Sequence, residues 1–232
     1  MPLPKIYPLK VGYSNSVLIK NGSQSVLVDT GVHGFMQLFQ KYFRRLSVQF
    51  SDIKLIILTH VHYDHTGNLK ELQKITGAKV AVNLNEYHNL KIGFIPVPAG
   101  ITPATRIISG IGRIFVPRFT SPPPFEADIV VENEYDLRNE FGIEGKIIPT
   151  PGHTKGSQSV LLGESLLSGD TFLNIQQGLV FPHFVNDPVQ LLKTWEMLFS
   201  LGIKEIYPGH GAKFNVNKAL EDYERWRIKF KV

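Results

Sequence analysis

Apolar and polar positions in the first third of the chain alternate between the spacing of strands and the spacing of helices. The run Leu-Ile-Ile-Leu at 55–58 has the length and branched composition of a buried strand. Residues 34–46 instead repeat apolar side chains three and four positions apart, as one face of a helix does. Thr66 is expected to cap a helix that Gly77 closes. The predicted strands are 5–11, 14–20, 25–29, 54–58 and 79–82, and the predicted helices are 34–46 and 66–75.

The second half of the chain returns to the same alternation and contains a clear helix start. Asp187 precedes Pro188, which combines an N-cap side chain with a proline at the first helical position. The predicted strands of this half are 128–131, 146–149, 157–162, 165–168 and 204–207, and the predicted helices are 188–201 and 216–229. Strands that alternate with helices indicate a layered α/β architecture.

Residues 89–127 interrupt the alternation. They are rich in Pro, Gly, Ile and Phe, and a segment this long without clear periodicity inside a compact domain is usually functional or mobile. Residues 105–115 fit a short basic amphipathic helix, although Gly110 and Gly112 weaken that interpretation. We therefore expect one domain over residues 1–232 with an insertion at about 89–127.

Composition is that of an ordinary globular protein. A chain of 232 residues with 43% apolar and 19% charged residues can bury a sizeable core. It has no cysteine, which excludes disulfides, thiolate ligands and a cysteine nucleophile, so a bound metal would need His, Asp or Glu. No apolar run reaches about 18 residues, and prolines and a lysine interrupt residues 1–6, so we expect no transmembrane helix, no signal peptide and a cytoplasmic location.

The formal net charge of +5 is unevenly placed. Between Asn89 and Phe125 there are four basic residues and no acidic residue, so this segment carries +4 of the total. The four are Lys91, Arg106, Arg113 and Arg118. The remaining chain is close to neutral, and we therefore expect a small-molecule substrate and no nucleic-acid partner.

Histidines crowd the end of the predicted strand 54–58. The stretch T-H-V-H-Y-D-H-T-G at 59–67 holds three histidines and one aspartate. A loop that leaves the end of a strand lets a rigid sheet aim polar side chains into a cleft. Imidazole nitrogen and carboxylate oxygen are ligands of zinc and neighbouring first-row metals. A chance His-rich surface turn is the alternative interpretation of this stretch alone.

Three further polar residues follow the same local pattern, in which a short apolar strand ends in a tight Gly or Pro turn. They are His153, Asp170 and His210. Each of these residues alone is weak evidence for a metal site, because a lone histidine after a turn is more often a cap or a solvated side chain. Together with the first cluster they make seven donors just past strand ends, which can converge on one edge of a sheet sandwich. Asp29, at the end of another strand, is expected to bond the turn backbone rather than to contact a metal directly, and a further role for it is the support of a ligand histidine.

On these residues the sequence resembles the metallo-β-lactamase-fold hydrolases. The family pattern is H-x-H-x-D-H followed by a separate His, Asp and His, and every position is present here. The local contexts T-H-x-H-x-D-H-x-G, P-G-H-T-x-G-S, S-G-D-T and Y-P-G-H-G are similar to those of the glyoxalase II-like branch. The resemblance spans about residues 10–215 and implies a four-layer αββα sandwich, with 89–127 as an inserted segment.

The same resemblance implies a centre of two divalent metal ions. Zinc is the expected metal, and iron and manganese are the alternatives. The implied ligands are His60, His62 and His153 for one ion, Asp64, His65 and His210 for the other, and Asp170 as the bridge. A hydroxide that bridges the metals is the implied nucleophile, because two cations about 3.5–4 Å apart lower the pKa of a bound water to near neutrality. From its place in the motif, Asp64 is expected to orient this hydroxide and pass a proton to the leaving group.

Several reactions fit these residues. Hydrolysis of an ester, thioester or lactone is the leading hypothesis. One alternative is a persulfide dioxygenase, a family with a similar motif that uses a single iron held by residues matching His60, His153 and Asp170. A second alternative is a phosphodiesterase that acts on a lipid or other phosphodiester. A non-catalytic binding module is disfavoured because such relatives typically lose ligands, and all seven are present.

The insertion at 89–127 is expected to select the substrate, as a lid over the mouth of the site. Its apolar residues and arginines suit a substrate with a hydrophobic part and a negative group. The alternatives are a structural flap, a homodimer contact or a peripheral contact with a membrane surface. The candidate substrate-binding residues are His183, Arg106, Arg113 and Arg118, whereas a structural role is favoured for His33 and His88.

Overall fold

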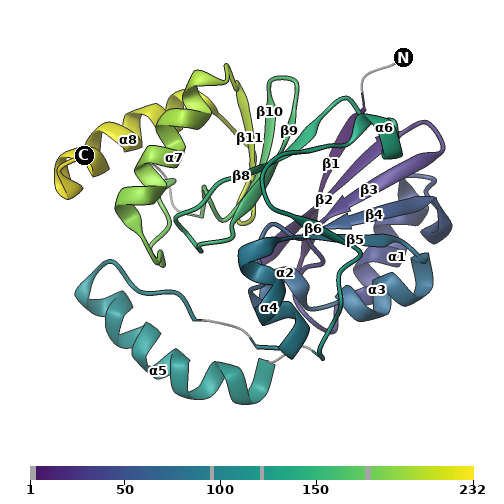
Figure 1. Cartoon of the computed structure of the whole chain (residues 1–232), viewed down its shortest axis with the longest axis horizontal. Helices are drawn as coiled ribbons and strands as arrows, with labels where there is room; N and C mark the ends of the chain where they lie inside the picture. The colour runs from purple at the N-terminus through teal and green to yellow at the C-terminus, as the bar shows by residue number, and fades with distance from the viewer. Residues whose placement is uncertain (1–3, 95–96, 121–122, 176–178) are drawn as a thin grey trace.

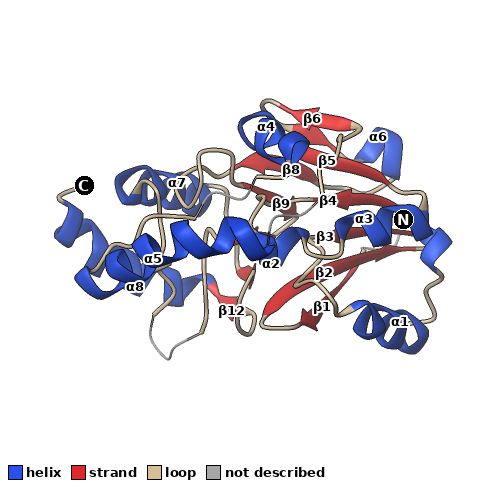
Figure 2. Cartoon of the chain, turned by 90° about the horizontal axis from the view of Figure 1, so that it is seen from below, coloured by secondary structure: helices blue, strands red, loops and turns tan. Residues whose placement is uncertain are grey.

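Two mixed sheets face each other, and helices cover the outer face of each (Figures 1 and 2). The structure is a computed structural model that describes residues 4–94, 97–120, 123–175 and 179–232, and of residues 114–120 it describes the backbone. Its arrangement is the four-layer αββα sandwich that the sequence predicted.

The first sheet is antiparallel on one side and parallel on the other. Its order is β1-β2-β3-β4-β5-β6, with antiparallel pairing from β1 to β3 and parallel pairing from β3 to β6. The strands are β1 (Lys5–Val11), β2 (Ser14–Asn21), β3 (Gln24–Val28), β4 (Ile53–Ile57), β5 (Lys79–Asn83) and β6 (Ile129–Val131).

The second sheet has the order β12-β11-β10-β9-β8-β7, and its described neighbours pair antiparallel except for the parallel pair β10 and β11. The strands are β7 (Tyr135–Asp136), β8 (Lys146–Pro149), β9 (Gln158–Leu162), β10 (Ser165–Gly169), β11 (Glu205–Pro208) and β12 (Phe214–Asn215).

The helices lie mainly outside this sandwich. They are α1 (Met36–Arg45), α2 (Tyr63–Thr66), α3 (Leu69–Thr76), α4 (Leu84–Ile92), α5 (Pro103–Thr120), α6 (Arg138–Phe141), α7 (Pro188–Ser200) and α8 (Val216–Phe230), with a short 3-10 helix at Phe50–Asp52. Figure 1 shows α5 apart from both sheets, running from the side of α7 and α8 towards α4. No helix in the described part of the chain is long and apolar enough to cross a membrane.

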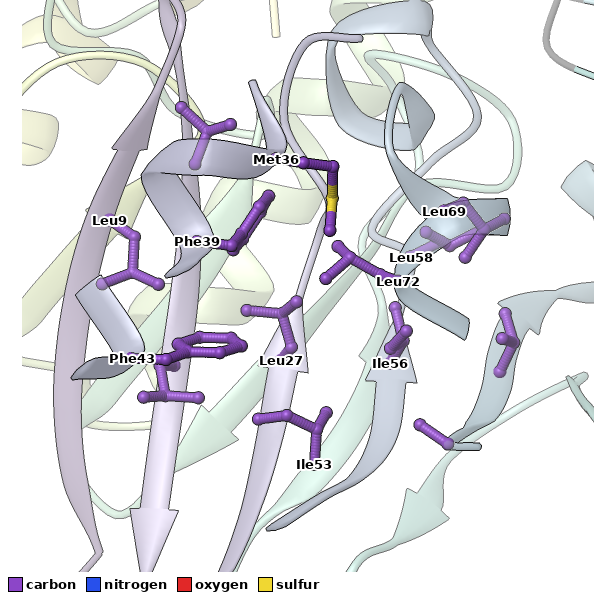
Figure 3. Close-up of a cluster of buried hydrophobic side chains, with 14 of the residues drawn as sticks. Leu9, Leu27, Met36, Phe39, Phe43, Ile53, Ile56, Leu58, Leu69 and Leu72 are labelled. Atoms are coloured by element: carbon purple, nitrogen blue, oxygen red, sulfur yellow. The ribbon is translucent and has the colours of Figure 1, made fainter. Parts of the chain in front are cut away.

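Three layers of buried side chains hold the sandwich together. On β3, Leu27 packs outward under Phe39 and Phe43 of α1 (Figure 3), whereas Val26 and Val28 point between the two sheets. This alternation explains the continuous apolar runs of the central strands, because both of their faces are buried. The third layer fills the space between the second sheet and helices α7 and α8, around residues such as Leu166, Ile206, Trp195 and Trp226.

The structure confirms the predicted architecture, corrects two local predictions and adds a helix. Thr66 ends the short helix α2 and does not cap the next helix, because its Oγ1 donates to the carbonyl of His62 and α3 begins only after Asn68. Helix α4 was not predicted, and it takes in the first residues of the 89–127 segment. The helix expected at 105–115 is longer, and Gly110 lies inside it.

Candidate metal centre

The seven predicted metal-binding residues meet at one edge of the sandwich. The cluster at 60–65 follows β4 of the first sheet and runs into α2. His153, Asp170 and His210 follow β8, β10 and β11 of the second sheet. All seven side chains are buried, and they form three overlapping groups whose donor atoms lie within 4.8 Å of one another. The groups are His60, His62 and His153; His60, His65 and Asp170; and Asp64, His65 and His210.

Backbone carbonyls and one carboxylate orient three of these imidazoles. His153 Nδ1 donates to the carbonyl of Phe184 (2.8 Å), and His210 Nδ1 donates to that of Tyr13 (2.9 Å). His65 Nδ1 donates to Asp29 (2.8 Å). Since Nδ1 is the hydrogen-bond donor in each ring, Nε2 is the nitrogen left to bind a metal.

Asp29 also fixes the first histidine of the cluster. It accepts from the backbone N–H and the hydroxyl of Thr59, both at 2.8 Å, and the Thr59 hydroxyl in turn accepts from His60 Nδ1 (3.0 Å). Asp29 is buried and adopts a left-handed backbone conformation with φ 59°. Both roles considered for Asp29 are therefore present, since it bonds the turn backbone and supports His60 and His65.

Electrostatics differ between the two halves of the centre. Burial lowers the pKa of His60 and lowers the pKa of His62 to about 3, so both rings are neutral. Burial also acts to lower the pKa of His210, but Asp170 and Asp64 outweigh it and raise that pKa to about 10. Conversely, His210 and His65 hold the pKa of Asp170 well below its usual range in spite of burial, which acts to raise it.

These residues fit divalent metal ions. Within the described residues, His60 Nε2, His65 Nε2 and Asp170 Oδ1 are buried and have no hydrogen-bond partner. Leaving such atoms without a partner is costly, and a metal ion satisfies them. His62 Nδ1 and His153 Nε2 are 3.0 Å apart, close to the roughly 3.3 Å between two nitrogens bound to one tetrahedral zinc at about 2.0–2.1 Å.

A tight turn beside the centre allows the ligand loops to approach each other. A Cβ added at Gly209 would lie 2.2 Å from Asp170 Oδ1 and 2.8 Å from His65 Cε1. On the other side of the same loop, Asn15 of β2 donates to the carbonyls of Pro208 (2.9 Å) and Gly211 (2.7 Å). The first sheet thereby holds the loop of the second sheet that carries His210.

A cavity of about 270 Å³ opens onto the centre. His62, Asp64, His153, Asp170 and His210 form part of its wall. The other lining residues are mostly apolar, and α5 closes one side. They are Tyr63, Val97, Pro98, Ile108, Ser109, Gly112, Leu173, Ile175, Pro182 and Phe184.

The other histidines and arginines singled out in the sequence lie elsewhere. His183 lines a neighbouring cavity of about 120 Å³, and Arg106 and Arg113 line a different cavity, on another face of α5. The side chain of Arg118 lies outside the described residues. His33 Nδ1 lies 3.0 Å from the carbonyl of Gly67, and His88 is exposed on α4.

Glu86 supports the centre and was missed in the sequence. It is buried on α4, and its carboxylate accepts from the backbone N–H of Val61 (3.3 Å), between two of the clustered histidines. Burial raises the pKa of Glu86, while hydrogen bonds from Thr154 and the N–H groups of Val61 and Gly156 act to lower it. Glu86 thus joins the loop after β4 to the loop that carries His153.

Two facing mixed sheets with a buried His and Asp cluster at their shared edge define an αββα sandwich with a candidate metal centre. The family model of the metallo-beta-lactamase superfamily matches residues 9–210. The chain belongs to this superfamily.

Known relatives agree with this assignment. The chain is 29% identical over 204 residues to a probable metallo-hydrolase from Methanocaldococcus jannaschii, and these residues cover 86% of this chain and 89% of that protein. It is 28% identical over 126 residues to a hydroxyacylglutathione hydrolase from Shewanella pealeana, which covers 54% of this chain but only 35% of that enzyme. An archaeal metallo-beta-lactamase superfamily protein from Sulfolobus tokodaii has the same fold, with a TM-score of 0.67 at 20% identity over 97% of this chain and 86% of that one. Relatives of the glyoxalase II type are thus found at low identity, and the assignment to that branch stays a prediction.

Proposed function

We propose that the chain is a binuclear zinc hydrolase that cleaves ester, thioester or lactone bonds. The position of Asp170 is the observation that supports two metals best. Its Oδ1 lies 3.3 Å from His65 Nε2, and its Oδ2 lies 3.5 Å from His210 Nε2 and 3.7 Å from His153 Nε2. The two oxygens of this carboxylate therefore face donors of both halves of the centre, which suits a bridging ligand.

The proposed ligand sets follow the grouping of donor atoms. They are His60, His62 and His153 for one ion, Asp64, His65 and His210 for the other, and Asp170 between them. When bound, such ions supply a water of lowered pKa and polarise a carbonyl oxygen. Histidine and carboxylate donors without a thiolate suit zinc and also iron or manganese.

Asp64 is the proposed catalytic side chain. Its Oδ2 lies 3.1 Å from His210 Nε2, and Asp64 also lines the cavity. A carboxylate in this position orients a water for attack and passes its proton to the leaving atom. His65 and His210 lower the pKa of Asp64 although burial acts to raise it, so the carboxylate is ionised.

The cavity wall favours an acyl substrate over a phosphodiester. No Lys or Arg is among the described residues that line this cavity. Outside the metal centre, a phosphodiester would therefore find no lysine or arginine for its charge, whereas an acyl chain can pack against Leu173, Pro182 and Phe184. We propose that the 89–127 segment acts as a lid through α5, whose Ile108 and Gly112 face the substrate.

Elemental analysis of the purified protein and a substrate panel test this function. We expect two zinc ions per chain and turnover of p-nitrophenyl esters, acyl thioesters and lactones, with little turnover of bis-p-nitrophenyl phosphate. Treatment with a chelator should abolish turnover, and added zinc should restore it. One iron per chain with oxygen uptake on a persulfide, or phosphodiester turnover above ester turnover, would contradict the proposal.

A matched pair of isoleucines tests the lid. Ile108 of α5 lines the cavity and Ile107 does not, although the two side chains are exposed to a similar degree. Each buried methylene contributes about 0.8 kcal/mol, so kcat/KM should rise roughly fourfold for each acyl carbon that enters the cavity. Ile108→Ala is expected to flatten this dependence across an acetyl to hexanoyl series, and Ile107→Ala should leave it unchanged. Equal chain-length profiles in both variants would show that α5 does not contact the substrate.

A further inference from the structure

A second cavity, of about 350 Å³, lies on another face of α5. Residues of α5, the segment 99–101, the turn before α7 and the end of α8 form its wall. Ser109 is the one residue that the described linings of the two cavities share. Its side chain is buried and donates to the carbonyl of Pro98. Helix α5 therefore separates the second cavity from the metal centre.

Two arginines line this second cavity. Arg106 and Arg113 are seven residues apart and hence on one face of α5. No acidic residue is among the described lining residues, and no ion pair of Arg106 or Arg113 occurs within the described part of the chain. Arginine forks of this kind match the oxygens of a phosphate or carboxylate group.

The rest of the wall is held in place by backbone pairing. Ala99 O accepts from Val185 N (2.8 Å), and Ile101 N donates to the carbonyl of His183 (3.1 Å). The Asn186 side chain accepts from Ala99 N (3.1 Å), which leaves its amide N–H groups as donors. Arg106 is oriented in the same way, because its Nε donates to the carbonyl of Gly100 (3.3 Å).

The remaining lining is apolar and includes Ile101, Val185, Pro188 and Phe230. A ligand of this cavity therefore needs an anionic head for the arginines and an apolar body for Phe230 and its neighbours. We propose that the cavity between α5 and the end of α8 is a binding site for a small organic oxyanion, separate from the metal centre. Arg106, Arg113 and Asn186 bind the oxyanion. This inference does not depend on which bond the metal centre cleaves.

Calorimetric titration of the zinc-loaded protein with phenyl phosphate tests the site. Arg113→Gln is the informative variant, since no hydrogen bond of Arg113 to the described protein would be lost. Loss of one charge-assisted hydrogen bond should weaken phenyl phosphate binding at least about tenfold. Arg44→Gln, which removes the same charge from an exposed position on α1, should leave it unchanged. Ester hydrolysis should be retained in both variants, because neither arginine lines the cavity at the metals.

Two further titrations separate this site from the metal centre and test the apolar wall. Inorganic phosphate should bind more weakly than phenyl phosphate, and Phe230→Ala should reduce that difference. Binding that disappears with the chelator but is the same in Arg113→Gln and wild type would place phenyl phosphate at the metals and overturn the proposal. Equal affinity of wild type and the Arg106→Gln/Arg113→Gln double variant would also overturn it.

Discussion

Asp170→Ala is expected to lose most bound metal and to abolish hydrolysis. The carboxylate faces donors of both halves of the centre, at 3.3 Å from His65 and 3.7 Å from His153. Changing a group that only supports a metal ligand typically costs about 10- to 100-fold in metal affinity or activity, so loss of a ligand shared by two ions should exceed about 100-fold. Elemental analysis and ester turnover at saturating zinc measure the two effects.

Glu132→Ala is a suitable control for this variant. Glu132 is an exposed acidic residue just after β6, so its replacement removes a carboxylate without touching the centre. It should keep the metal content and the turnover of the wild type. Full turnover and full metal occupancy in Asp170→Ala would refute the assignment of Asp170 as the bridging ligand.

Asp29→Ala is expected to lower both stability and metal affinity. The buried carboxylate accepts three hydrogen bonds, from Thr59 N, Thr59 Oγ1 and His65 Nδ1. Each donor left without a partner costs about 1–3 kcal/mol, so the free energy of unfolding should fall by about 3 kcal/mol or more. Metal affinity should fall about 10- to 100-fold, because His65 and His60 lose the group that orients them. Denaturant unfolding and competition with a chelating dye measure these changes.

Asp29→Asn separates the backbone contribution from that of the charge. Asparagine tolerates the left-handed conformation found here at φ 59°, and its carbonyl can still accept from Thr59 N. The Nδ2 group that replaces Oδ2 is only a donor, so it cannot accept the hydrogen bond from His65 Nδ1. We therefore expect Asn to recover part of the stability but little of the metal affinity. If Ala and Asn gave the same stability, the three hydrogen bonds would not be what holds this turn.

The strands that deliver the ligands were predictable because their side chains obey simple periodicities. Leu55 and Ile57 pack between the sheets and Ile56 packs under the helices, so a fully apolar run indicates a central strand. Helix α4 was missed for the opposite reason. Its buried face includes Glu86 beside Leu90, and a buried carboxylate interrupts the apolar pattern by which an amphipathic helix is recognised.

The groups that orient His153 and His210 could not have been found in the sequence. They are the backbone carbonyls of Phe184 and Tyr13, and every residue type presents a carbonyl. Which cavity the arginines of α5 line could not be predicted from the sequence either. Isoleucines and arginines both occur along α5, and only its rotation in the fold directs Ile108 to the metals and Arg113 to the second cavity.

The division of the ligands between the two sheets has a consequence for folding. Each proposed ligand set takes donors from the loop after β4 in the first sheet and from a loop of the second sheet, as in His62 and His153, which are 91 residues apart. A metal ion bound in this way crosslinks two loops that are far apart in the sequence, as a disulfide does. The free energy of coordination offsets the entropy cost of closing the long loop between them. In a chain without cysteine, two such ions would fasten the sandwich at the edge where catalysis takes place, so that the supply of metal sets how firmly the two halves stay joined.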